Sequence, residues 1–167
     1  MELTETFLQY LKEYGLYFVF LIIFLEYLNL PGFPAGIILP ATGVLAAQTK
    51  YSLPVVIFVS VGAGLLASII LYYVGSLIGG SLLDKLRKKY KKIDESINST
   101  KVYIDKYGTK GVFISRLIPV ARTLISFIAG LFKINIVKFM TYSVFGIAIY
   151  NSVFILLGFF GAEILIK

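Results

Sequence analysis

The sequence contains no cysteine, no histidine and no tryptophan among its 167 residues. The absence of cysteine excludes disulfides and thiol chemistry. The absence of histidine removes the commonest general base and a frequent metal ligand. We therefore expect no metal and no cofactor, and we expect the protein not to be an enzyme.

Charged residues are also scarce. They make up 15% of the chain, whereas hydrophobic residues make up 58%. Soluble domains have about 25% charged and 45–50% apolar residues, so a water-soluble globule could not cover this much apolar surface. The composition predicts an all-α integral membrane protein with a single membrane domain, residues 1–167, that crosses the cell membrane several times.

The few charges are unevenly placed. Residues 79–110 hold nine of the sixteen cations, against four acidic residues. Cytoplasmic loops carry such an excess of lysine and arginine, so we expect residues 80–110 to form a basic cytoplasmic linker. The same cations would attract anionic lipid headgroups. Nucleic acid is not an expected partner, because the segment is short and flanked by membrane.

Three apolar segments fit spanning helices, at residues 15–30, 53–79 and 136–166. Residues 51–83 contain no charge, and 24 uncharged residues separate Lys138 from Glu163; about 20 residues are enough to cross a bilayer. Small residues between 60 and 68 fit a close helix contact inside the chain or in a homo-oligomer, so the oligomeric state stays open. Residues 1–14 fit an amphipathic helix at the interface.

Two further apolar segments are interrupted. Residues 31–50 contain three prolines and three glycines, and residues 111–132 are broken by Pro119. Irregular backbone is tolerated at membrane depth only where protein or a cavity satisfies its peptide groups. We therefore predict two re-entrant helical hairpins. Because each is followed by a spanning helix, the order predicts a pseudo-two-fold inverted repeat, as in many transporters. With both hairpins re-entrant, the N-terminus lies inside and the C-terminus outside.

The second interrupted segment carries two arginines, Arg116 and Arg122. An arginine at the centre of a membrane helix costs about 2.5–3.5 kcal/mol even on lenient scales. Their guanidinium groups could bind an anion, most naturally a phosphate, through paired hydrogen bonds. The broken backbone around Pro119 could add N–H donors. The alternative is that the arginines extend to the membrane surface without binding anything.

Glu26 is the acidic residue inside the first apolar segment. A buried carboxylate pairs with a cation or takes up a proton. Glu26 is therefore a candidate for substrate binding and for proton coupling. The alternative places it near the interface as an ordinary solvated charge.

Several motifs together resemble the DedA family, which shares a domain with the eukaryotic VTT lipid scramblases. These motifs are EYLNLPGFPAGIILPATGVLA, GAGLLASIILYYVGSLIGG and YGTKGVFISRLIPVARTLISFIAG. The most specific part runs from Arg116 through Pro119 to Arg122 and Thr123, followed by Ala129-Gly130. The similarity spans roughly residues 20–161.

The resemblance implies two re-entrant hairpins that face each other across the bilayer, and movement of a lipid-linked phosphate, such as a polyprenyl phosphate, between leaflets. It also implies that Glu26, Arg116 and Arg122 are functionally important. The chain departs from the family pattern where Gly36 and Ser68 replace expected acids, and where Tyr150 replaces a tryptophan. These departures favour flipping without a driving ion.

The predicted function is thus a flippase-like or scramblase-like transporter of a phosphate-bearing lipid, bound by Arg116, Arg122, Glu26, Pro119 and Thr123. Membrane lipids are the expected partners. One alternative is a proton-coupled transporter of small ions or drugs. Another is a membrane-embedded lipid phosphatase, which would need a nucleophile or a metal-held water that the apolar segments do not offer.

Overall fold

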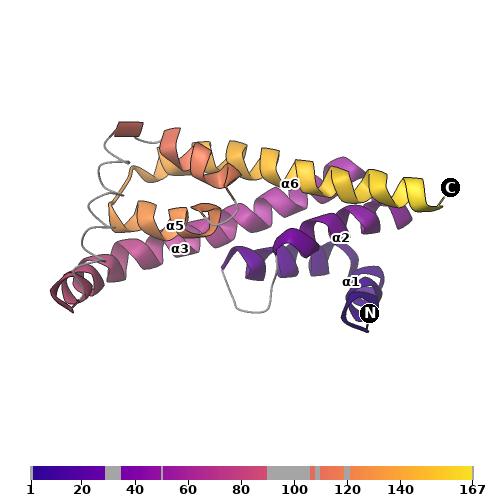
Figure 1. Cartoon of the computed structure of the whole chain (residues 1–167), viewed down its shortest axis with the longest axis horizontal. Helices are drawn as coiled ribbons and strands as arrows, with labels where there is room; N and C mark the ends of the chain where they lie inside the picture. The colour runs from indigo at the N-terminus through magenta and orange to yellow at the C-terminus, as the bar shows by residue number, and fades with distance from the viewer. Residues whose placement is uncertain are drawn as a thin grey trace. The chain divides into compact units, whose positions relative to one another are not determined.

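A computed structural model describes the backbone of residues 2–28, 35–49, 51–89, 106–107, 110–118 and 121–166. The helices are α1 (Glu2–Tyr27), α2 (Ala35–Gln48), α3 (Leu53–Lys89), α5 (Ala121–Leu131) and α6 (Ile136–Ile166), shown in Figure 1. A shorter helix, residues 110–117, precedes α5. The described residues contain no strand, so the predicted all-α class is confirmed.

Two helices are long and apolar enough to cross a membrane. Their spans are Leu53–Gly79 in α3 and Ile136–Ala162 in α6, with mean hydropathies of 2.5 and 2.0. The third predicted span corresponds to a shorter apolar helix, Tyr14–Tyr27. It forms the second part of α1, which is broken at Gly15 (φ 56°, ψ −130°), a left-handed conformation that glycine adopts readily.

Apolar side chains are exposed along the spans, and several polar side chains are buried between the helices. Large apolar side chains on the spans are exposed, for example Phe58 and Leu77, each at 80%. The buried side chains include many polar and charged ones: Glu26, Thr42, Ser60, Ser68, Ser115, Arg116, Arg122, Ser126, Ser143 and Asn151. Exposed apolar side chains on two long apolar helices indicate a lipid environment around these spans.

Two helices differ from the expected boundaries. α3 continues to Lys89, ten residues beyond the apolar span that ends at Gly79, so the first part of the predicted linker is helical. An α-helix satisfies its own backbone in lipid and in water alike, so it can continue past the apolar span. The first interrupted segment, residues 31–50, contains one helix, α2, which has Pro40 inside it. The other prolines of the first interrupted segment, at 31 and 34, and most of the basic linker, residues 90–105, lie outside the described residues.

The chain divides into two compact units. Unit 1 comprises Met1–Ala67 and Ile147–Lys167, and unit 2 comprises Ser68–Gly146. The larger apolar cluster belongs to unit 1 and joins α1, α2, the first part of α3 and the second part of α6. The smaller cluster belongs to unit 2 and consists of Tyr72, Val112, Ile125, Ala129 and Phe139.

In unit 1, α2 crosses α6 at a pair of glycines. A Cβ atom placed on Gly43 would lie 2.0 Å from the carbonyl oxygen of Ile155. A Cβ atom placed on Gly158 would lie 1.9 Å from the carbonyl oxygen of Pro40. The two backbones are therefore in direct contact, which only glycine permits at both positions.

In unit 2, α5 crosses α3 in the same way (Figure 1). A Cβ atom on Gly130 would lie 1.9 Å from the carbonyl oxygen of Tyr72, and one on Gly75 would lie 2.2 Å from that of Phe127. In both crossings the carbonyl that each glycine meets belongs to the residue three positions before the partner glycine. Each unit thus contains one reciprocal glycine crossing of the same geometry.

Candidate functional site

The two arginines predicted from the sequence lie in unit 2, on either side of a bend. Arg116 is in the last turn of the 110–117 helix and Arg122 in the first turn of α5. The bend is at Ile118, whose amide donates to the carbonyl of Ser115 at 3.3 Å. Arg116 and Arg122 are 1% and 2% exposed and are the two largest fully buried side chains among the described residues.

The guanidinium of Arg116 is hydrogen-bonded to both neighbouring helices of unit 2. Its Nη2 donates to the hydroxyl oxygens of Ser126 on α5 and Ser143 on α6, at 2.9 and 3.0 Å. Its Nη1 donates to the backbone carbonyl of Arg122 at 3.3 Å. Ser143 lies seven residues into the α6 span, about 10 Å along the helix from its start. The Arg116 head is therefore held inside the protein.

One backbone donor beside the bend is already in use. The amide of Arg122 donates to the carbonyl of Ile118 at 2.9 Å. Pro119 lies outside the described residues. Thr123 lies in α5, but its side chain is outside the described residues. The roles predicted for these two residues stay predictions.

The surroundings of Arg116 hold a positive charge away from water. The guanidinium carbon lies 5.6 Å from the centre of the Phe139 ring, within the range of a cation–π interaction. Hydroxyl and carbonyl oxygens accept its hydrogen bonds to Ser126, Ser143 and Arg122. These bonds and the Phe139 ring stabilise the guanidinium where water is excluded.

Glu26 belongs to unit 1, whereas both arginines belong to unit 2, so its predicted pairing with an arginine stays a prediction. Glu26 is 3% exposed, which excludes the alternative of a solvated interfacial charge. The next residue, Tyr27, donates its hydroxyl to the side-chain oxygen of Asn151 on α6 at 2.7 Å. Asn151 in turn donates to Ser60 on α3 at 3.3 Å. The helix end that carries Glu26 is therefore held by a buried hydrogen-bond network.

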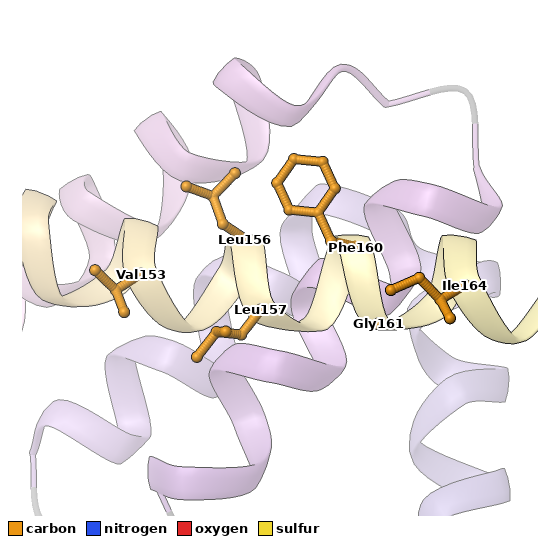
Figure 2. Close-up of a pocket in the computed structure, with 6 residues that line it drawn as sticks. All are labelled: Val153, Leu156, Leu157, Phe160, Gly161 and Ile164. Carbon is orange, nitrogen blue, oxygen red and sulfur yellow. The ribbon is translucent and has the colours of Figure 1, made fainter.

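Unit 1 also carries an open, apolar groove of about 490 Å³ on α6. Figure 2 shows its lining: Val153, Leu156, Leu157, Phe160, Gly161 and Ile164. All six residues come from one helix, and none is polar. The groove therefore suits hydrocarbon and offers nothing to a phosphate.

Sequence reasoning found the arginines and missed the residues that hold Arg116. Ser126 carried a weak signal, because it lies four residues after Arg122 and so on the same face of α5. Ser143 and Gly146 lie on a different helix, and no local pattern in the sequence links them to Arg116. The network around Asn151 was missed for the same reason.

A comparison with known protein families matches residues 30–160 to the VTT domain. This match covers most of the chain, including both arginines. The chain belongs to the DedA family of VTT domain proteins. It is therefore a membrane protein, as the lipid-facing spans require.

Several relatives of this VTT domain protein are similar over most of their length. Undecaprenyl phosphate transporter A of Staphylococcus aureus is 32% identical over 154 residues, which cover 90% of this chain and 75% of the relative. An alkaline phosphatase-like protein of Lactococcus lactis is 28% identical over 159 residues, covering 92% and 74%. Protein DedA of Escherichia coli is 26% identical over 155 residues, covering 89% and 70%. No solved structure matches the chain.

Proposed function

We propose that this protein moves a phosphate-bearing lipid, such as a polyprenyl phosphate, between the leaflets of the membrane, and that its buried arginines bind the phosphate. The observation that carries the proposal is the burial of Arg116 and Arg122, at 1% and 2% exposure, in a protein whose spans face lipid. A buried positive charge is costly and persists where it has a function. A relative named undecaprenyl phosphate transporter A, 32% identical, supports the same substrate class.

The proposal includes an architecture for transport. The interrupted segments 31–50 and 111–132 would be re-entrant hairpins of an inverted repeat, in a multi-pass arrangement with residues 80–110 in the cytoplasm. The matching glycine crossings support a repeat, because α2 and α5 occupy corresponding places in the two halves of the chain, as do α6 and α3. An inverted repeat lets one site be reached from either side of the membrane in turn.

The direct test is reconstitution of the purified protein into phospholipid vesicles with a labelled polyprenyl phosphate. We expect the labelled lipid to cross between leaflets faster than in protein-free vesicles at the same lipid composition. Release of inorganic phosphate is measured in the same samples. Faster crossing without phosphate release supports a transporter. Phosphate release without faster crossing contradicts it and favours a lipid phosphatase.

The phosphatase remains a second candidate because two relatives from Lactococcus lactis are named alkaline phosphatase-like. Phosphate-ester hydrolysis needs an activated nucleophile or a metal-held water. The sequence has no histidine or cysteine, and no group of three or more potential metal ligands occurs among the described residues. Serine residues near Arg116 act as hydrogen-bond acceptors for a cation, and a base that could activate them is not among their described partners.

Glu26 is our candidate for proton coupling. If transport requires Glu26 to gain and lose a proton, the rate of lipid crossing in the wild type should change between about pH 5 and pH 9. The Glu26→Gln variant, which cannot titrate, should lose this change. A wild-type rate that stays constant over the whole range removes proton coupling, and leaves a passive exchange between leaflets.

A further inference from the structure

The described contacts of Arg116 leave its guanidinium poorly suited to hold a phosphate. A guanidinium holds a phosphate or carboxylate best through two parallel N–H bonds. The pair of donors is either Nη1 with Nη2 or Nε with Nη2, so Nη2 takes part in both arrangements. Both hydrogens of Nη2 are already used by Ser126 and Ser143, at 2.9 and 3.0 Å. A paired contact with phosphate would break at least one of these bonds.

The same contacts position the helix that carries Arg122. Nη1 of Arg116 donates to the carbonyl of Arg122 itself, and Nη2 donates to Ser126, one turn further along α5. The bond to Ser143 connects this arrangement to α6. Arg116 therefore fixes the first turn of α5 against α6, and with it the backbone from which Arg122 extends.

α6 is shaped to receive Arg116. A Cβ atom placed on Gly146 would lie 2.6 Å from Cβ and 2.9 Å from Cγ of Arg116. The stem of the arginine thus fills the space that a side chain at position 146 would need. Gly146 and Ser143 are three residues apart, so one face of α6 holds both the stem and the head of Arg116.

We infer that Arg116 is a positioning residue, seated by Ser126, Ser143 and Gly146, and that Arg122 is the arginine that meets the lipid phosphate. The inference rests on the proposed function and gives the two arginines different roles in it. The ligand class of Arg122 is a phosphate monoester or diester on a lipid.

The test is a double-mutant cycle in the vesicle assay, comparing Arg116→Met, the combined variant Ser126→Ala/Ser143→Ala, and all three substitutions together. Removing the two hydroxyls should lower the rate of lipid crossing by about 10- to 100-fold, because small displacements of a binding group reduce rates by such factors. Adding Arg116→Met should lower it by less than a further tenfold, because both serine bonds are already lost and only the weaker bond to the Arg122 carbonyl remains among the hydrogen bonds described above. Ser152→Ala on α6 is the matched control.

A second measurement separates positioning from binding. Inorganic phosphate is added as a competitor, and the concentration that halves lipid crossing is recorded. Arg122→Lys should raise this concentration, because it alters the phosphate contact. The serine variant should leave it unchanged while lowering the maximum rate. Gly146→Ala should behave as the serine variant does, because it displaces the stem of Arg116 and removes no charge.

Two outcomes overturn the inference alone. One is a further loss of tenfold or more when Arg116→Met is added to the serine variant, which would mean that Arg116 does more than position α5. The other is a weakened response to inorganic phosphate in the serine variant. A wild type that moves no lipid overturns the proposed function itself, and the inference with it. The two failures are therefore distinguishable.

Discussion

Replacing Arg122 with glutamine is expected to lower the rate of lipid crossing about 30-fold or more. Removing one partner of a buried, hydrogen-bonded charge pair costs about 2–5 kcal/mol, and each 1.4 kcal/mol is a factor of ten. Arg122 is 2% exposed, so water cannot take the place of the lost guanidinium. Arg122→Ala should have the same effect or a larger one. Rates are measured in vesicles with equal amounts of reconstituted protein.

Two further substitutions separate the shape of Arg122 from its charge. Arg122→Lys keeps the charge but loses the planar pair of donors, so it should retain part of the activity, about a tenth of the wild-type rate. Lys138→Gln removes an exposed charge on α6 and should leave the rate close to that of the wild type. Equal losses in Arg122→Gln and Lys138→Gln would mean that net charge matters and the buried site does not.

Replacing Gly130 with alanine is expected to destabilise the protein by about 3 kcal/mol, at the upper end of the range for overpacking. The added methyl group would lie 1.9 Å from the carbonyl oxygen of Tyr72, and a backbone atom cannot move aside as a side-chain end can. α3 and α5 must therefore separate along their whole contact. Gly43→Ala should have a similar effect in unit 1, where the methyl group would lie 2.0 Å from the carbonyl oxygen of Ile155. Thermal unfolding in detergent measures both.

The matched control is Gly62→Ala, on α3. A Cβ atom at position 62 would have no atom within 4 Å, so the substitution adds no clash. It should leave stability unchanged or raise it slightly, because alanine favours a helix over glycine by up to about 1 kcal/mol. If the Gly130→Ala and Gly62→Ala variants unfolded at the same temperature, this result would contradict the close crossing of α3 and α5.

The sequence predicted those features that depend on composition along a single segment. An uncharged run of sufficient length identifies the span in α3 and that in α6, because the bilayer selects for apolar length alone. Arg116 and Arg122 could also be identified as candidate site residues from the sequence alone. A charge in an apolar membrane segment is costly whatever the fold around it.

What the sequence did not predict depends on contacts between segments far apart in the chain. Ser143 is 27 residues from Arg116 and Asn151 is 124 residues from Tyr27, so no local periodicity relates them. The similarity between the α2–α6 and α5–α3 crossings could not be predicted either, because it depends on contacts between separate helices. Gly43 and Gly130 are each one glycine among 15, and only the partner helix shows which of them require close approach.

The central claim, that the buried arginine site binds the phosphate of a lipid, is tested most directly by ligand affinity. The solubilised protein is titrated with a short prenyl phosphate and with the corresponding prenyl alcohol, which differ only in the phosphate. We predict that the wild type binds the phosphate at least about tenfold more tightly than the alcohol, as a charge-assisted contact requires, and that Arg122→Gln binds the two equally. Equal affinities in the wild type, or a preference for phosphate that survives in Arg122→Gln, would contradict the claim.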